Sequence, residues 1–267
     1  ALFLRPFDWF LFAAVFLISI ASLSVINSFT GESSLFDRQL LWQVVSLFVM
    51  LTCGFVDWRF LRRTDAIVSI FALASLVLIL VLSLGTDVNG SHSWFRFGSV
   101  SLQPSDLAKV VLILVLAKYF SRRHIIIADV KHIIVSGLYA FVFFALVFIQ
   151  PDFGSAIVLF LIWLGMVLVS GISKKHLLVV FSVGLAVFAF LWFFVFVDYQ
   201  KQRIETFLNP MTDIRGSGYN ALQSVIAVGS GGFWGKGLGY GTQSRLNFLP
   251  EYETDFIFAA FAEEWGF

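Results

Sequence analysis

Three carboxylates stand within five positions of LPEYETDFIFA, residues 249–259, in a chain that is otherwise rich in apolar residues. Glu251 and Glu253 are close enough in sequence to raise the pKa of Asp255 by like-charge repulsion, and partial burial at a membrane interface would raise it further. An acid whose pKa is shifted toward neutrality suits a general base, which takes a proton from a reacting group. The pattern therefore predicts Asp255 as a catalytic residue, with Glu251 as a binding residue beside it.

A structural interpretation of Asp255 stays open. The residue lies where a loop becomes an apolar run, and an aspartate there can cap a helix and complement its dipole, which stabilises by about 0.5–2 kcal/mol. Thr254 could cap the same helix, so a cap does not require Asp255. Glu263 and Glu264 follow along the same run, and both need polar partners.

A second polar group stands at the start of another apolar run, PSDLAKVVLILVLAKYF. Pro104 fits the first turn of a helix, because a proline lacks only an N–H that would be unpaired there. Asp106 complements the helix dipole, and Lys109 follows three residues later, where two helical side chains can pair. Lys109 is then either a lysine that snorkels to the interface or a cation that binds an anionic head group in an internal cavity.

Two further segments leave alternatives open. QPDFGSA, residues 150–156, reads as a Pro-Asp turn between two apolar runs, although Asp152 could point into the same outer cavity. GSGGFWGKGLGYGTQ, residues 229–243, is not a Walker A loop, because Gly237 stands where a serine or threonine would follow Lys236. This glycine-rich segment either packs as a turn or presents Lys236 to a phosphate.

Several other classes of site and partner are excluded. No GxSxG, HExxH or Cys/His metal spacing occurs, so no metal site is predicted. A net charge of +1 without a basic tail indicates no nucleic acid partner. The single cysteine, Cys53, can form no internal disulfide.

In the loop 85–103, Asn89-Gly90 is a tight-turn signal.

Membrane-spanning helices must position these residues. The chain is 59% hydrophobic and 13% charged, whereas a soluble domain carries roughly 25% charged residues. A span needs ~20 apolar residues, and separate segments satisfy their backbone in lipid only as helices. The predicted fold class is therefore all-α, a polytopic helical membrane protein. The runs are Phe7–Asn27, Leu40–Phe55, Ala66–Leu84, Pro104–Phe120, Ile133–Ile149, Gly154–Ser170 and His176–Val197, and an eighth begins at Phe256.

Lysine and arginine in the short loops predict the orientation. If the N-terminus lies in the cytoplasm, the short outer loops contain only two such residues, Arg38 and Arg96. Residues 198–255 then form a large outer loop, in which YNALQSVIAVGSGGFWGKG predicts a short amphipathic or re-entrant helix followed by a glycine-rich turn. We expect this loop to roof a cavity. The nine cytoplasmic residues are Arg5, Arg59, Arg62, Arg63, Arg122, Arg123, Lys131, Lys174 and Lys175.

Four segments resemble the SEDS family (shape, elongation, division and sporulation), and its elongation members more than its division members. They are NGSHSWFRFGSVSLQPSDLAKV, QPDFGSAIV, RGSGYNALQS and, most specific, GKGLGYGTQSRLNFLPEYETDFIFAAFAEEWGF. The resemblance covers the whole chain. Family members have ten spans, so residues 1–267 are expected to be a single membrane domain that is incomplete at its C-terminus.

The resemblance implies a peptidoglycan glycosyltransferase of the bacterial cytoplasmic membrane, with its site on the outer face and its essential aspartate at Asp255. The implied substrate is lipid II, a disaccharide-pentapeptide on undecaprenyl pyrophosphate. A class B penicillin-binding protein is the implied partner, beside membrane lipid. No cofactor is assigned, and Mg²⁺ or Mn²⁺ stays open. Candidate substrate-binding residues are Lys109, Asp106, Trp94, Arg96, Asp152, Lys236, Gln243, Arg245 and Glu251.

The sequence departs from the family pattern at two positions. Ser93 stands where the family often has an arginine before Trp94, which makes Arg96 a candidate substitute. Asp106 replaces the usual glutamate after QPS, so the charge is kept on a side chain that is one methylene shorter. A lipid II flippase is the alternative function, although transporters tend to show internal repeats and none is found here. A scaffold that recruits wall enzymes is a third.

Overall fold

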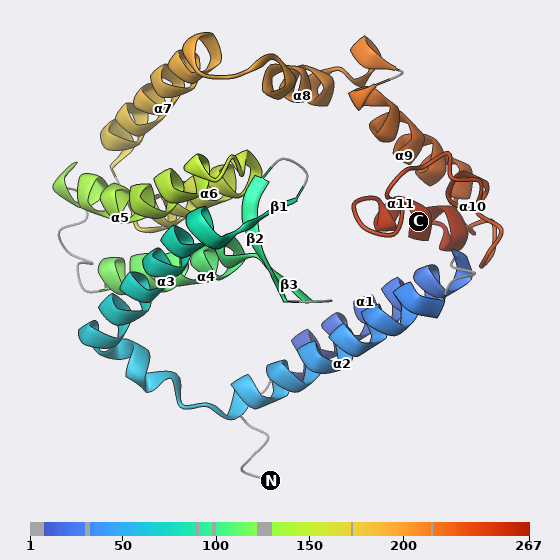
Figure 1. Cartoon of the computed structure of the whole chain (residues 1–267), viewed down its shortest axis with the longest axis horizontal. Helices are drawn as coiled ribbons and strands as arrows, with labels where there is room; N and C mark the ends of the chain where they lie inside the picture. Colours follow the sequence, from blue (N-terminus) through green and yellow to red (C-terminus); the bar gives the residue numbers. More distant parts are fainter. Residues whose placement is uncertain are drawn as a thin grey trace. The chain divides into compact units, whose positions relative to one another are not determined.

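The computed structural model describes residues 8–29, 33–88, 91–97, 100–121, 130–171, 173–214 and 216–267. Most of these residues are helical (Figure 1). The turn signal at Asn89-Gly90 lies outside the described residues. In chain order the elements are α1 Trp9–Phe29, α2 Ser33–Phe55, η1 Trp58–Arg62, α3 Thr64–Leu84, β1 Thr86–Val88, β2 Ser91–Phe97, β3 Val100–Leu102, α4 Pro104–Ser121, α5 Val130–Ile149, α6 Phe153–Val169, α7 Lys174–Phe194, α8 Asp198–Leu208, η2 Pro210–Asp213, α9 Ser217–Gly231, α10 Thr242–Arg245 and α11 Ile257–Trp265.

The predicted apolar runs form helices. Within the described residues, α1, α2, α3, α5 and α7 are long and apolar enough to cross a membrane, and α6 is a shorter apolar helix. Helix α4 is less apolar, because its 18 residues include Asp106, Lys109 and Lys118. The eighth run forms α11. The prediction of a polytopic helical membrane protein is thereby confirmed.

The chain divides into two compact units, which are described separately. Unit 1 comprises residues 1–56 and 190–267, and unit 2 comprises residues 57–189. That residues 1–267 act as a single membrane domain stays a prediction. The predicted site residues fall into both units: Trp94, Arg96, Asp106, Lys109 and Asp152 lie in unit 2, and Lys236, Gln243, Arg245, Glu251 and Asp255 lie in unit 1.

Unit 2 is a bundle of α3, α4, α5 and α6 (Figure 1). Ala108, Leu112 and Leu116 recur every four residues along α4, so they share one helix face. All three are fully buried, in one cluster with Phe143 of α5 and Leu159 of α6. This packing fixes the direction of α4 and therefore the place of the polar residues in its first turns.

A small antiparallel sheet connects α3 to α4, where only a loop was predicted. The strand order is β1-β2-β3. Thr86 of β1 pairs with Trp94 of β2, and Arg96 of β2 pairs with Ser101 of β3. The sheet gives the 85–103 segment a defined backbone, and it holds Trp94 and Arg96 on a strand rather than on an irregular loop.

Unit 1 contains the segment 198–255, which is partly helical as predicted, with α8, η2, α9 and α10. Helix α9 packs beside α11, and the core between them includes the buried Ala227, Leu249 and Ala259. The predicted amphipathic helix is α9, and the glycine-rich segment follows it. The large loop is therefore a packed structure built on α11.

The glycine-rich segment approaches the backbone of α11 at two points. A Cβ added to Gly231 would overlap the carbonyl oxygen of Ala262, and a Cβ added to Gly235 would overlap that of Glu264. Gly235 also has φ of +70°, a conformation that residues with a side chain rarely adopt. Glycine is required at Gly235 for both reasons.

Gly235→Ala is expected to lower the free energy of unfolding by about 1–3 kcal/mol, because alanine strains the backbone and its methyl group overlaps Glu264. Gly229→Ala is the matched control. No atom lies within 4 Å of a Cβ at Gly229, and alanine favours a helix by roughly 0.5–1 kcal/mol over glycine. Thermal unfolding in detergent compares the two variants, and equal midpoints would contradict the close approach.

Candidate functional site

The candidate catalytic residue lies on a turn, residues 249–256, that we call the acidic turn. Leu249 is buried, and Tyr252 and Phe256 pack against the core of α9 and α11. The backbone N–H groups of Thr254 and Phe256 donate to the carbonyl oxygen of Glu251, at 3.2 and 3.1 Å. These contacts hold the turn in one conformation.

Two carboxylates of the acidic turn face solvent. Glu251 and Asp255 are exposed, whereas Tyr252, Glu253 and Phe256 of the same turn are half-buried. Within the described part of the chain, no donor forms a hydrogen bond with the Asp255 carboxylate. A fixed backbone thus presents an exposed carboxylate, which is the arrangement that a general base needs before substrate binds.

Asp255 does not cap the following helix. Helix α11 begins at Ile257, and its N-cap position is Phe256, whose side chain makes no capping hydrogen bond. Thr254, the other predicted cap, donates its hydroxyl to Glu251 Oε2 at 2.9 Å instead. The capping interpretation is therefore wrong for both residues, because the turn continues to Phe256 before the helix starts.

A tyrosine stabilises the neighbouring carboxylate of the acidic turn. Burial and a hydrogen bond to Glu253 together raise the pKa of Tyr252 to about 12, because both disfavour the phenolate. The Tyr252 hydroxyl is therefore neutral at physiological pH and donates to Glu253. This hydrogen bond orients the side chain of Glu253, which lies two residues before Asp255. The sequence pattern did not predict the hydrogen bond.

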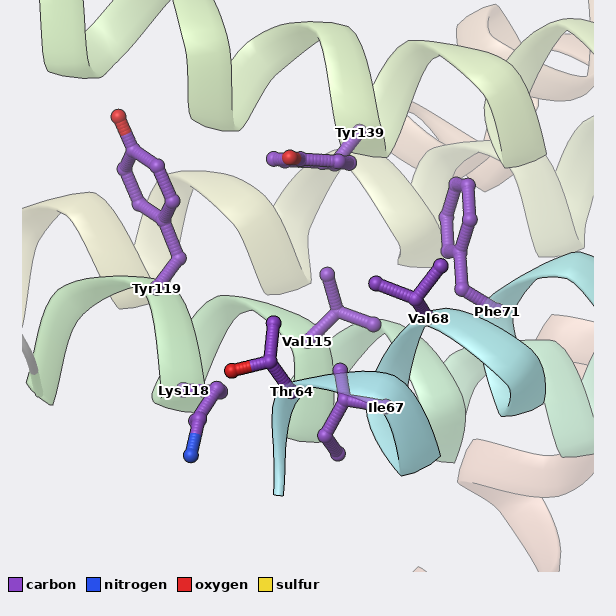
Figure 2. Close-up of a pocket in the computed structure, with 8 residues that line it drawn as sticks. All are labelled: Thr64, Ile67, Val68, Phe71, Val115, Lys118, Tyr119 and Tyr139. Atoms are coloured by element: carbon purple, nitrogen blue, oxygen red, sulfur yellow. The ribbon is translucent and has the colours of Figure 1, made fainter. Parts of the chain in front are cut away.

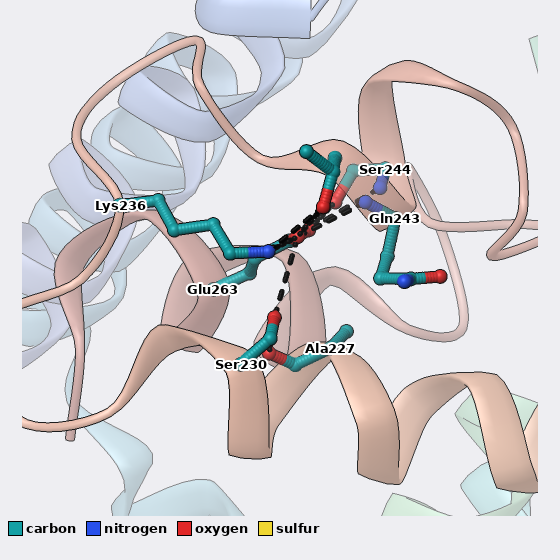
Figure 3. Close-up of polar contacts among 7 residues, drawn as sticks. Ala227, Ser230, Lys236, Gln243, Ser244 and Glu263 are labelled. Carbon is teal, nitrogen blue, oxygen red and sulfur yellow. Dashed lines mark hydrogen bonds and ion pairs between the residues drawn. The ribbon is translucent and has the colours of Figure 1, made fainter.

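Helix α11 carries a carboxylate, Glu263, that has no exposed surface. Figure 3 shows the polar contacts around it. Lys236 Nζ lies 2.8 Å from Glu263 Oε1 and forms an ion pair with it. Because a buried carboxylate is costly without partners, these contacts are needed for α11 to pack. The other donors to the Glu263 carboxylate are the Thr242 hydroxyl at 3.2 Å, the Gln243 N–H at 2.9 Å, the Ser244 hydroxyl at 2.8 Å, the Ser244 N–H at 3.3 Å and the Ser230 hydroxyl at 3.5 Å.

The next residue, Glu264, is also buried. Its carboxylate accepts a hydrogen bond from the Ser28 hydroxyl of α1, at 2.8 Å, and one from the backbone N–H of Gly239. Its carbonyl oxygen accepts the N–H of Gly237 at 3.0 Å. Glu264 therefore ties α1, α11 and the glycine-rich segment together. The polar partners that Glu263 and Glu264 were expected to need are thus present.

Lys236 has the packing role that was one of its two interpretations. Its ammonium bonds to Thr242 at 2.8 Å as well as to Glu263. Its substrate-binding role stays a prediction, and a phosphate would have to compete with a buried carboxylate for the same ammonium.

Glu263 and its donors form what we call the Glu263 cluster. Gln243 belongs to this cluster, and Arg245 follows it in the chain. Arg245 is exposed, with its Nη1 3.4 Å from the carbonyl oxygen of Gly239. Among the described residues, the Gln243 side-chain oxygen is buried and accepts no hydrogen bond. A buried acceptor without a donor is uncommon and invites a partner from outside the chain.

In unit 2, Lys109 and Asp106 form the predicted pair, with Nζ 2.8 Å from Oδ1. The Asp152 side chain caps α6 by accepting the N–H of Ser155 at 3.0 Å, and its second oxygen accepts from Gln103 at 2.7 Å. The turn interpretation of Asp152 is confirmed. The hydrogen bond to Gln103 also links the starts of α4 and α6, so Asp152 lies at the same end of the bundle as the Asp106–Lys109 pair.

Arg96 and Ser93 lie on different faces of β2. Successive side chains of a strand alternate, so Trp94 and Arg96 share one face while Ser93 and Phe95 share the other. Ser93 is buried and Arg96 is exposed. An arginine at position 93 would therefore point away from Arg96, and the prediction that Arg96 substitutes for it gains no support from the strand geometry.

No group of three or more His, Cys, Asp or Glu residues in the described ranges is placed to hold a metal ion. The exposed carboxylates of the acidic turn, Glu251 and Asp255, follow the cations Lys236 and Arg245 along the chain.

Comparisons with known proteins identify the family to which the chain belongs. A family model described as "Cell cycle protein", FTSW_RODA_SPOVE, matches residues 2–267. The peptidoglycan glycosyltransferase MrdB of Escherichia coli (strain K12) is 39% identical over 197 residues, which cover 74% of this chain and 53% of MrdB. The probable peptidoglycan glycosyltransferase FtsW of Nitrosococcus halophilus (strain Nc4) is 34% identical over 257 residues, which cover 94% of this chain and 64% of FtsW.

The fold is similar to that of a solved chain in the structure described as "Structural coordination of polymerization and crosslinking by a peptidoglycan synthase complex". The TM-score is 0.76 at 29% sequence identity, and the alignment covers 98% of this chain and 72% of the other. This chain spans about half to two thirds of the length of the two curated relatives.

Proposed function

Because the chain belongs to the FtsW/RodA/SpoVE family of cell cycle proteins, we propose that it is a peptidoglycan glycosyltransferase that polymerises lipid II into glycan strands for cell-wall elongation. Family and helices together make it a multipass protein of the bacterial inner membrane. The family that the sequence resembles is thus confirmed. The exposed Asp255 carboxylate on the anchored acidic turn is the observation that carries the proposal.

In the proposed reaction, Asp255 takes the proton of the acceptor's sugar hydroxyl. The hydroxyl oxygen forms a bond to the anomeric carbon of the donor while the bond from that carbon to the pyrophosphate oxygen breaks. The electron pair leaves with undecaprenyl pyrophosphate. General base catalysis of this kind contributes typically ~10²–10⁴-fold. A direct displacement of this kind inverts the anomeric configuration.

Cations stabilise the leaving pyrophosphate, and charge stabilisation is usually a large term in catalysis. Arg245 supports this role best, because its guanidinium is exposed on the segment that leads into the acidic turn. Lys109 is the proposed cation of unit 2, with Asp106 holding its ammonium. A divalent cation would need oxygen ligands from the substrate as well, so no step is assigned to one.

Four further residues are proposed to bind the substrate. The unpaired oxygen of Gln243 supports a contact with a substrate donor. Trp94 and Arg96 share a face of β2, where a ring and a cation can contact a sugar and an anion. Glu251 lies beside Asp255 on the acidic turn.

The proposed orientation rests on the charged residues in the loops, and the proposed partner rests on the structural relative. The N-terminus lies in the cytoplasm and residues 198–255 face the exterior, because lysine and arginine concentrate in the other loops. The structural relative is described as part of a complex that polymerises and crosslinks peptidoglycan. A class B penicillin-binding protein, which supplies the crosslinking activity, is therefore the proposed partner of this chain.

The test supplies labelled lipid II in detergent to the purified full-length protein, with and without its partner. Long glycan chains on a gel are expected. If neither preparation forms chains, even with Mg²⁺ or Mn²⁺, the polymerase proposal fails. Translocation of lipid II across liposomes would then indicate the flippase instead.

A further inference from the structure

Unit 2 contains a pocket between α3, α4 and α5 (Figure 2). The sheet lies at the opposite end of this bundle (Figure 1). The chain enters α3 at Thr64 and leaves α4 soon after Lys118, and both residues line the pocket. The strands connect the other ends of the same two helices. The pocket is therefore separate from Trp94, Arg96 and the Asp106–Lys109 pair, and it does not depend on the proposed function.

The pocket has a volume of about 340 Å³ and a mostly apolar lining, to which Thr64, Lys118, Tyr119 and Tyr139 add polar atoms. Ile67, Val68 and Phe71 come from α3, and Val115 comes from α4. Val68 is 59% exposed within this apolar lining. An exposed apolar side chain on a helix long enough to cross a membrane faces hydrocarbon rather than water. The depth of the pocket is thus suited to an alkyl chain.

One of the residues that line the pocket, Lys118, is a cation. Lys118 Nζ donates a hydrogen bond to the backbone carbonyl oxygen of Arg62, which holds the ammonium at the start of α3. Segment 57–65, which leads into α3, contains three arginines and two aspartates, so this segment and Lys118 together carry a net charge of +2. The members are Arg59, Arg62, Arg63 and Lys118, against Asp57 and Asp65, and Asp57 pairs with Arg59 at 3.7 Å.

We propose that this pocket binds an anionic phospholipid, with an acyl chain among Ile67, Val68 and Phe71 and the phosphate near Lys118. The orientation predicted from the loops places this end of α3 in the cytoplasmic leaflet. Basic pockets between helices on that side bind anionic head groups. The apolar lining and the Lys118 ammonium together fit an amphiphile that has an acyl chain and an anionic head group.

Two other occupants fit the pocket less well. A free phosphate would use the Lys118 ammonium but leave the apolar lining without a partner. A partner helix is about 10–12 Å across with its side chains, which is too wide for this pocket. Its volume of 340 Å³ lies near the lower end of the ~300–1,000 Å³ typical of small-molecule pockets. A phospholipid with one acyl chain in the pocket uses both the apolar lining and the Lys118 ammonium.

The test titrates the delipidated full-length protein, in uncharged detergent, with short-chain phosphatidylglycerol or phosphatidylcholine and counts bound lipid by native mass spectrometry. Phosphatidylglycerol is expected to bind about tenfold more tightly than phosphatidylcholine. Lys118→Gln is expected to weaken phosphatidylglycerol binding by about fivefold, the effect of one cation near a head group. Lys175→Gln, which removes an exposed lysine of α7 that does not line the pocket, should leave it unchanged.

A second variant keeps the test decisive if Lys118→Gln fails to fold. Val68→Trp fills the pocket from an exposed position and keeps every charge, so it should lose one bound phosphatidylglycerol per protein. Equal binding of the two lipids, equal effects of Lys118→Gln and Lys175→Gln, or an unchanged lipid count in Val68→Trp would each overturn the proposal. Binding of inorganic phosphate in place of the lipid would also overturn it.

Discussion

Replacing Asp255 by asparagine is expected to lower the rate of glycan polymerisation by about 10²–10⁴-fold while the protein stays folded. Asparagine has the shape of aspartate but cannot accept the proton of the attacking hydroxyl. The fold should tolerate the change, because the Asp255 carboxylate is exposed and caps no helix. Loss of activity without loss of stability is the signature of a chemical rather than a structural role.

The measurement compares initial rates of chain formation from labelled lipid II, together with thermal unfolding of each preparation. Glu205→Gln is the matched control, because it removes an exposed carboxylate from α8 in the same predicted outer segment. Its rate should equal that of the parent protein. Full activity of Asp255→Asn would assign the proton transfer to another group, and Glu251 on the same turn would be tested next.

Lys236→Met is expected to destabilise the protein by about 3 kcal/mol, near the lower end of the range for breaking a buried ion pair. The variant leaves Glu263 fully buried without its cation. The lower end applies because the Lys236 side chain is partly exposed, and because hydroxyl and amide donors to Glu263 remain. Activity should fall with stability, because the Glu263 cluster holds the segment that leads to the acidic turn.

A double variant separates this structural role from a direct contact with substrate. Lys236→Met combined with Glu263→Gln removes both charges, so it should be less destabilised than the sum of the single variants. Lys201→Met is the control for loss of a lysine from the same unit. If Lys236→Met abolishes activity and leaves the unfolding midpoint unchanged, Lys236 acts on the substrate and the structural role is refuted.

Local patterns predicted local structure well. The hydrophobic runs located the helices, because length and composition alone decide whether a segment can cross a membrane. The pair of Asp106 and Lys109 followed from their spacing of three residues on a helix. Such features depend on neighbours in the chain, so the sequence contains all the information they need.

The features that depend on distant partners were not predictable in the same way. The sequence showed that Glu263 and Glu264 need polar company, but not that Lys236 and Ser28 supply it. These partners are close only because α1, α9 and α11 pack together. The strand Ser91–Phe97 was missed because Trp94 and Phe95 are adjacent aromatic residues, which breaks the alternation that marks a strand.

The hydrogen bond between Ser28 and Glu264 also sets an order for biogenesis. The two residues are 236 positions apart, and at ~5–20 residues per second a ribosome needs roughly 10–50 s to synthesise that interval. During this time Ser28 can bond to the carbonyl oxygen of Val25, 2.8 Å away in its own helix. The first helix can therefore enter the membrane with its hydroxyl satisfied. The glycine-rich segment, by contrast, gains its anchors only when α11 emerges, so this segment can pack only after Glu264 has been synthesised.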